Sequence, residues 1–169
     1  MKYFSGFSLE REEAFFKEQL INSDYSVAGF SYGAQKAFEY VYNTSERVDR
    51  LILISPAFFQ NHKQSFIKMQ LRYFKADQEA YRKAFLGNVT YPLSFSLDAY
   101  LKDGTYDELN DLLSYVWDED KIKALLNRGV IIEVFMGDAD KIVDVEKSFE
   151  FFSALLPLTL FKERGHLLQ

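Results

Sequence analysis

The stretch "YSVAGFSYGAQKAFEY", residues 25–40, joins an apolar strand pattern directly to a helical pattern. The apolar run reaches Gly29, Ser31 follows two positions later, and Gly33 lies two positions beyond the serine. In the segment after Gly33, apolar residues recur at the spacing of one buried helix face: Ala34, Phe38 and Val41. A serine in a tight strand-to-helix turn, with small residues on both sides, presents its hydroxyl above the end of a sheet. Ser31 is therefore a candidate nucleophile, and its context must separate that role from a simple turn serine.

The rest of the chain places this turn in an alternating pattern of strands and helices. Strand patterns occur at residues 2–4, 25–30, 50–59, 130–137 and 158–165, and helical patterns at 9–20, 32–43 and 145–156. Such alternation is typical of βαβ units with a parallel sheet. Residues 60–128 contain helical patterns without a strand between them. We therefore expect one α/β domain of about five mainly parallel strands, with a core of residues 1–59 and 129–169 and a helical lid, residues 60–128, inserted after the third strand.

The first helical pattern, residues 9–20, carries the signals of a helix start. Ser8 is placed to act as its N-cap, and Glu10 and Glu12 suit the positive end of the helix dipole. We therefore expect a regular helix here with Glu10 and Glu12 in its first turn.

Composition limits the classes of function. The 169 residues are 48% hydrophobic and carry a net charge of −5, which argues against general nucleic-acid binding. Cysteine is absent, so the chain can form neither a disulfide nor a thiolate metal site. No apolar signal core and no run of 18 apolar residues occurs, so we expect a soluble, cytoplasmic protein that does not enter a membrane.

Partners for Ser31 follow in the order that this kind of fold requires, with the acid before the histidine. The turn after the strand at 130–137 offers three aspartates, and the segment after the last strand holds His166, one of only two histidines. Asp138, Asp140 and Asp144 compete as the acid, although Asp144 is also placed to cap the next helix. His62 breaks the order and is expected to be a surface residue. The backbone N–H groups of Tyr32, at the helix start, and of Phe7, in the loop after the first strand, are the expected oxyanion donors.

These residues resemble the α/β-hydrolase fold, and the whole chain is similar to the short pimeloyl-acyl-carrier-protein methyl ester esterases of the BioV type. The segments that carry the resemblance are "YFSGF", "VAGFSYGAQKAFEY", "IEVFMGDADKIVD" and "GHLLQ". The family presents its acid in a Gly-x-x-Asp turn, which selects Asp140. The resemblance implies a minimal α/β-hydrolase that uses Ser31, Asp140 and His166 to release methanol from the pimeloyl methyl ester on acyl carrier protein, without a metal or another cofactor.

The lid supplies a candidate docking surface for that carrier. Residues 61–83 have a local net charge of +4, whereas residues 98–120 have −7. In the segment 64–76, three apolar residues, Ile67, Leu71 and Phe74, form a stripe suited to the core or to an acyl chain. Lys68, Arg72 and Lys75 repeat the same spacing one residue later, and such a basic ridge suits the strongly acidic acyl carrier protein.

Two further expectations concern the sheet and the rival functions. Few helices are available to cover one face of the sheet, so we expect exposed apolar surface there, and a homodimer that buries this face is a hypothesis. A general acyl esterase or thioesterase needs the same catalytic parts as the methyl ester esterase. A non-catalytic module that binds acyl carrier protein is the third function considered.

Overall fold

The computed structural model describes all 169 residues and contains one sheet of five parallel strands. The strands lie in the order in which they occur in the chain: β1 (Lys2–Phe4), β2 (Ser26–Phe30), β3 (Arg50–Ile54), β4 (Ile131–Gly137) and β5 (Leu158–Phe161). The four pairings are all parallel, so the carboxyl ends of the strands share one edge of the sheet. The expected five-stranded parallel α/β architecture is confirmed.

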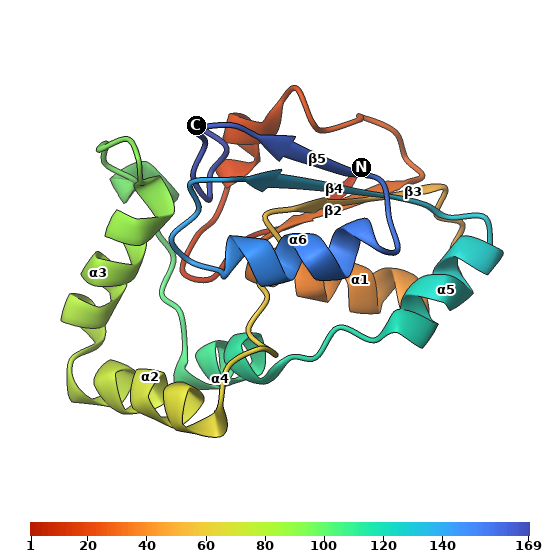
Figure 1. Cartoon of the computed structure of the whole chain (residues 1–169). Helices are drawn as coiled ribbons and strands as arrows, with labels where there is room; N and C mark the ends of the chain where they lie inside the picture. Colours follow the sequence, from red (N-terminus) through yellow and green to blue (C-terminus); the bar gives the residue numbers. More distant parts are fainter.

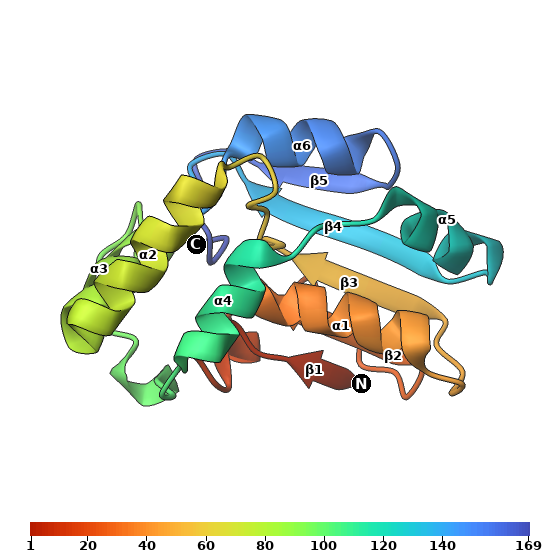
Figure 2. The same ribbon diagram turned by 90° about the horizontal axis from the view of Figure 1, so that it is seen from below.

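Three helices cover one face of the sheet. Helices α1 (Tyr32–Asn43), α5 (Glu119–Asn127) and α6 (Val145–Ser153) lie on the same side of the strands (Figures 1 and 2). The expected helix 32–43 has the predicted bounds, and its apolar side chains are buried: Ala34, Phe38 and Val41. Alternate strand residues meet these helices in a core cluster of 28 buried residues. This core fixes the start of α1 beside the carboxyl end of β2.

The opposite face is covered by short and irregular segments rather than by long helices. The expected helix 9–20 is wrong: the chain forms only a 3₁₀ helix, η1 (Glu12–Phe16), and Ser8 has a φ of 59° instead of capping a helix. Phe16 packs beside Phe30, and the C-terminal residues Leu167 and Leu168 join the same cluster. The central residues of this face, Ala28, Ile52 and Ile54, are fully buried. The expected exposure of this face is therefore wrong at β2 and β3.

Part of the same face remains open at β4 and β5. Ile131 is 49% exposed, and Phe135 stacks on Phe161 in a half-buried position. An ion pair between Arg50 and Glu133 lies on this face, and such charged side chains disfavour association with another sheet. The homodimer stays a prediction, which light scattering at micromolar concentration can test.

The lid lies at the carboxyl ends of the strands (Figure 1). It consists of α2 (Gln64–Ala76), α3 (Gln78–Thr90), the short η2 (Asp98–Tyr100) and α4 (Tyr106–Ser114). Helix α5, which falls within residues 60–128, packs beside α1 instead, and its Ile122 and Leu125 belong to the main core. The inserted helices that lie beyond the sheet are therefore α2 to α4, because α5 is the crossover helix between β3 and β4.

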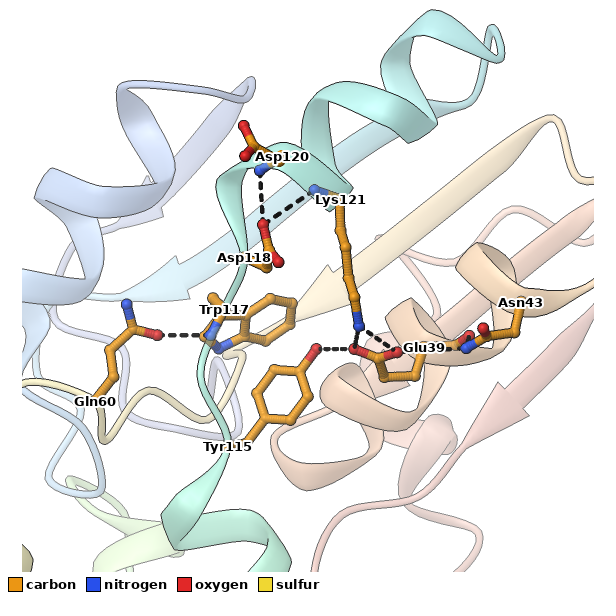
Figure 3. Close-up of polar contacts among 8 residues, drawn as sticks. All are labelled: Glu39, Asn43, Gln60, Tyr115, Trp117, Asp118, Asp120 and Lys121. Carbon is orange, nitrogen blue, oxygen red and sulfur yellow. Dashed lines mark hydrogen bonds and ion pairs between the residues drawn. The ribbon is translucent and has the colours of Figure 1, made fainter.

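Hydrogen bonds tie the chain leaving the lid to the chain entering it. The Trp117 indole N–H donates to the Ala57 carbonyl at 2.9 Å, and its backbone N–H donates to Gln60 Oε1 at 2.7 Å. Figure 3 shows that Tyr115 and Lys121 both reach Glu39 on α1, with Tyr115 Oη 2.8 Å from Glu39 Oε1. Burial and the adjacent Glu39 carboxylate raise the pKa of Tyr115, so its hydroxyl stays a donor. These contacts anchor both stems of the lid to the sheet beside α1.

No helix of the protein is long and apolar enough to cross a lipid bilayer.

Two glycines of the chain offer a matched test of the packing between β2 and α1. A Cβ added at Gly29 would lie 2.1 Å from the Gly33 carbonyl oxygen, whereas one added at Gly87 in α3 would meet nothing within 4 Å. We expect Gly29→Ala to lower the free energy of unfolding by about 2–3 kcal/mol or more, because backbone atoms must move apart. Gly87→Ala should raise it by about 0.5–1 kcal/mol through helix propensity. Urea denaturation of both variants measures the difference, and equal effects would contradict the close approach.

Candidate active site

Ser31 occupies the strained turn between β2 and α1. Its backbone has φ 55° and ψ −115°, a region that costs a non-glycine residue about 1–3 kcal/mol. The surrounding hydrogen bonds hold it there: the Ser31 N–H donates to the Ile54 carbonyl, and the Ser31 carbonyl accepts from Ala34 and Ala57. The expected strand–turn–helix context of Ser31 is therefore present.

The small residues around Ser31 are required by close backbone contacts. A Cβ at Gly33 would lie 1.9 Å from the Phe4 carbonyl oxygen, so the loop after β1 lies directly on the start of α1. The corresponding Cβ at Gly29 would meet Gly33 itself. The spacing of the two glycines thus allows the nucleophile turn to approach the loop that follows β1.

A buried pair of side chains lies at the same edge of the sheet. His166 Nδ1 is 2.5 Å from Asp140 Oδ2, and the two residues are 0% and 9% exposed. The other oxygen, Asp140 Oδ1, accepts the N–H groups of Ile142 and Val143, so the turn after β4 fixes the carboxylate. A carboxylate at Nδ1 favours the imidazole tautomer whose Nε2 can accept a proton. The pair therefore has the arrangement of a base with its orienting acid.

The remaining candidate residues are assigned to other contacts. Asp138 Oδ1 accepts the Glu163 N–H at 2.6 Å and joins the β4 turn to the histidine loop. Asp144 caps α6 by accepting the Lys147 N–H, as expected from its position. His62 is half-buried and stacks on Phe66, with ring centroids 4.2 Å apart. Of the three aspartates, the structure brings Asp140 to His166.

Ser55 is a site residue that the sequence analysis missed. It is fully buried at the end of β3 with φ 40°, and its hydroxyl donates to the His166 carbonyl at 2.6 Å. Gly165 packs under the Tyr91 carbonyl of the lid, where an added Cβ would lie 1.5 Å from the oxygen. The backbone of the histidine loop is thus held from both sides. The only sequence signal for Ser55 was its place after a strand and before Pro56.

Two buried polar atoms of the site have no hydrogen-bond partner in the chain. They are Ser31 Oγ and His166 Nε2, on residues that are 2% and 0% exposed. The His166 ring packs on Phe30, the residue before Ser31, with centroids 4.9 Å apart. A nucleophile–base hydrogen bond is often long until a substrate is bound. Both atoms that an acyl transfer needs are therefore among the buried polar atoms that the fold leaves unpaired, which also include Glu12 Oε2 and Gln35 Oε1.

The loop after β1 carries the Phe7 N–H, which the sequence analysis named as an expected oxyanion donor. The Phe7 N–H has no acceptor in the chain, and the Tyr32 N–H, as the first of α1, has no intrahelical acceptor. The Phe7 side chain is buried and packs against Phe74 and Phe85 of the lid. Glu12, expected in the first turn of a regular helix, lies in η1, is fully buried and accepts the Gly6 N–H at 2.7 Å.

Two cavities flank the site. One of about 350 Å³ lies between the lid and the turn after Asp140 and is mostly apolar; it is lined by Phe59, Phe66, Gln70, Tyr73, Tyr81, Ala84, Phe85, Asn88, Leu112, Leu113, Lys141 and Ile142. The other, of about 250 Å³, borders the loop after β1 and is lined by residues 3–9, Tyr32, Lys36, Lys102, Asp103 and Glu108. The first cavity reaches Lys141 and Ile142, next to Asp140, and the second reaches Phe7 and Tyr32, next to Ser31.

Helix α2 presents three different faces. The stripe Ile67, Leu71 and Phe74 is buried in the main core, so the structure assigns it to packing rather than to the cavity. The cavity is lined by Phe66, Gln70 and Tyr73. Lys68, Arg72 and Lys75 are exposed, and none forms an ion pair with a carboxylate of the chain. At about 100° per residue, this basic ridge faces away from the apolar cavity, on the side where Lys75 lies over the Tyr106 ring at 4.3 Å.

The donor set of the site suits acid–base and nucleophilic chemistry. No group of three or more histidine, aspartate or glutamate side chains converges in a way that could hold a metal ion.

The Asp140–His166 hydrogen bond can be tested without an activity assay. A short hydrogen bond from an imidazole Nδ1–H to a carboxylate moves that proton far downfield in the ¹H NMR spectrum. We expect one such signal from wild type and from Asp138→Asn, and its loss in Asp140→Asn. With only two histidines in the chain, His62→Gln identifies the source of the signal. Loss of the signal in Asp138→Asn but not in Asp140→Asn would show that Asp138, and not Asp140, pairs with His166.

Comparison of the chain with known proteins identifies its family. The chain matches the family model of the alpha/beta hydrolase fold over residues 4–146. No curated protein sequence matches it at a significant level.

Similar solved structures include an esterase from Exiguobacterium antarcticum, at 19% identity and a TM-score of 0.62, which matches 91% of this chain and 63% of its own. Carboxylesterase CesB from Bacillus subtilis matches 93% of this chain and 57% of its own, at 18% identity and a TM-score of 0.60. BioG from Haemophilus influenzae matches 98% and 87%, at 12% identity and a TM-score of 0.62. The chain thus spans less than two thirds of the two esterases' length. Because the family model covers most of its residues, the protein belongs to the α/β-hydrolase family.

Proposed function

We propose that the protein is a serine carboxylesterase with Ser31 as nucleophile, His166 as general base and Asp140 as the acid that orients it. The observation that carries this proposal is the buried Asp140–His166 pair at the edge of the sheet where Ser31 lies. Neither His166 Nε2 nor Ser31 Oγ has a hydrogen-bond partner in the chain, and the His166 ring packs on Phe30, the residue before Ser31. Ser31 itself lies on the strained turn at a helix start. These are the parts of an acyl-transfer site, and they come from the ends of three different parallel strands.

The reaction would proceed through an acyl-enzyme. His166 Nε2 takes the Ser31 proton as Oγ attacks the ester carbonyl carbon, and Asp140 stabilises the imidazolium that forms. His166 then gives this proton to the departing alkoxide, so the alcohol leaves as the acyl group stays on Ser31. A water molecule, deprotonated by His166, hydrolyses the acyl-enzyme and restores the serine.

Charge on the carbonyl oxygen would be stabilised by backbone donors. The Tyr32 and Phe7 N–H groups are proposed for this role because neither has an acceptor within the chain, and each such donor contributes about 3 kcal/mol to the transition state. The helix dipole of α1 adds a positive potential at the same point. No metal or organic cofactor enters this scheme.

We propose the methyl ester of a pimeloyl chain on acyl carrier protein as the substrate. The resemblance of the sequence to the short esterases of this type supports the proposal, and BioG, which the chain matches over 87% of its length, is comparably compact. The apolar cavity of about 350 Å³ suits a short aliphatic chain. The same catalytic parts would also serve another acyl ester or a thioester, so substrate comparison decides the assignment.

The basic ridge Lys68, Arg72 and Lys75 is proposed to receive the acidic carrier. The ridge is exposed and free of internal ion pairs, which leaves its charge available to a partner. Because it faces away from the apolar cavity, the carrier arm would approach from the side of α4 and the loop after β1. The polar cavity at that loop contains Lys36 and Lys102 but also Asp103 and Glu108, and Lys36 pairs with Glu108, so the positive charge offered to the carrier is confined to the ridge itself. The cytoplasm is the compartment that this proposal requires, because acyl carrier protein acts there.

Ser31→Ala tests the nucleophile. We expect kcat for ester hydrolysis to fall by about 10⁴- to 10⁶-fold, while the melting temperature changes little, because Ser31 Oγ makes no hydrogen bond in the fold. His166→Ala should cost about as much, and the double variant little more, because triad members act as a unit.

The assay should compare the pimeloyl-carrier methyl ester, a short chromogenic ester and an acyl thioester by kcat/KM. A serine-reactive phosphonate should label wild type at Ser31 and leave Ser31→Ala unlabelled. Labelling at another serine, or hydrolysis by Ser31→Ala at the wild-type rate, would overturn the proposal. A dominant thioester activity would keep the mechanism and change the substrate.

Reversal of the basic ridge tests the carrier. In Lys68→Glu/Arg72→Glu/Lys75→Glu we expect KM for the carrier-bound ester to rise about 5- to 20-fold, with hydrolysis of the small chromogenic ester unchanged. The effect should resemble that of added salt on wild type, because exposed charges are screened.

A variant with the same change of net charge provides the control. Lys17, Lys147 and Lys162 are exposed cations outside the lid, and their reversal to glutamate should leave both substrates nearly unaffected. Equal losses in the two triple variants would mean that only net charge matters. An unchanged KM in the ridge variant would place the carrier elsewhere on the surface.

A further inference from the structure

Glu12 is the one buried carboxylate that the proposed mechanism does not use. It is 0% exposed in η1, and burial raises the pKa of its carboxyl. Oε1 accepts the Gly6 N–H at 2.7 Å and the Tyr3 hydroxyl at 3.2 Å, whereas Oε2 has no partner. Burying an ionisable group with an unsatisfied oxygen opposes folding. Keeping this carboxylate buried therefore lowers the stability of the fold, which packing alone would not explain.

Glu12 contacts the loop after β1, which carries the Phe7 N–H. The Gly6 N–H is held by Glu12, and the Gly6 carbonyl accepts the Leu9 N–H at 3.2 Å. The Gly6 carbonyl and the Phe7 N–H belong to the same trans peptide unit, so they point in opposite directions. Fixing both polar groups of Gly6 therefore fixes the direction of the Phe7 N–H.

The loop is also in contact with the residue before the nucleophile. A Cβ at Gly6 would lie 2.8 Å from the Phe30 ring, and Phe30 immediately precedes Ser31. No side chain can be added at Gly6 without moving one or the other. The loop and the nucleophile turn are thus adjacent, and a rotation of the Gly6 peptide would change where the Phe7 N–H points relative to Ser31.

We propose that Glu12 is a positioning residue, which acts through the Gly6 N–H to keep the Phe7 N–H directed at the developing oxyanion. This inference rests on the proposed esterase function. Tyr3 donates from β1 to the same oxygen, but it forms no hydrogen bond with Gly6. The role requires a hydrogen-bond acceptor at the position of Oε1 and does not require a negative charge.

Three variants separate this role from ordinary packing. Glu12→Met keeps the volume and removes the acceptor, Glu12→Gln keeps an acceptor without the charge, and Tyr3→Phe removes a buried hydrogen bond to the same oxygen without touching Gly6. With the small chromogenic ester, we expect Glu12→Met to lower kcat about 10- to 100-fold at nearly constant KM, short of the loss of a whole oxyanion donor. Glu12→Gln and Tyr3→Phe should stay within about threefold of wild type.

A second measurement does not depend on catalysis. In the ¹H–¹⁵N NMR spectrum, the Gly6 and Phe7 amide signals should shift and broaden in Glu12→Met and remain near their wild-type positions in Glu12→Gln. If Glu12→Met does not fold, Glu12→Asp, whose shorter side chain withdraws the oxygen from Gly6, should show the same loss of kcat and the same amide shifts.

The outcomes are distinct. A folded Glu12→Met or Glu12→Asp with wild-type kcat overturns the inference, as does a Glu12→Gln variant as slow as Glu12→Met. A loss of activity in Tyr3→Phe equal to that in Glu12→Met would reduce the role to general stability. A wild-type protein that hydrolyses no ester and takes no phosphonate label would overturn the proposed function, while unaltered Gly6 and Phe7 amides in Glu12→Met would separately overturn the positioning role.

Discussion

The strained backbone at Ser31 is the constraint on which the site depends. A φ of 55° at a serine persists only when its surroundings supply compensating interactions. Here the parallel neighbour β3 accepts the Ser31 N–H, and the chain just beyond β3 donates to its carbonyl. The glycines on either side let α1 and the loop after β1 approach within contact distance. The turn is thus set by the sheet, and the sheet by the burial of its two faces.

From this turn, the other parts of the site follow from the parallel sheet. Parallel strands bring their carboxyl ends to one edge, so the segments after β1, β2, β3, β4 and β5 meet there. They contribute the Phe7 N–H, Ser31, Ser55, Asp140 and His166. Several of these groups are held by short contacts to their neighbours, such as Ser55 to the His166 carbonyl and Glu12 to Gly6. Groups that are held in this way require little reorganisation when charge develops.

The lid is joined to the site through its anchored stems and through aromatic packing. Ala57 donates to Ser31 and accepts from Trp117 at the far stem, so both ends of the lid are fastened beside Ser31. Phe7 packs on Phe74 and Phe85 of the lid, so the loop after β1 and helices α2 and α3 support one another.

The sequence by itself determined the strand–helix alternation, the five parallel strands, the turn at Ser31 and the position of His166 after the last strand. These features are local: periodicity, glycine spacing and chain order are written in neighbouring residues. Among three aspartates within seven residues, only the resemblance to the family's Gly-x-x-Asp turn favoured Asp140. The tertiary structure brings this residue, and neither Asp138 nor Asp144, to His166, because the turn after β4 directs each carboxylate differently. Glu12 was expected in the first turn of a regular helix, and its burial against the loop after β1 follows only from the tertiary structure. Likewise, the assignment of Ile67, Leu71 and Phe74 to the core, and of the opposite side of α2 to solvent, depends on which elements pack against that helix. Contacts between residues distant in sequence decided these points, and no local pattern specifies them.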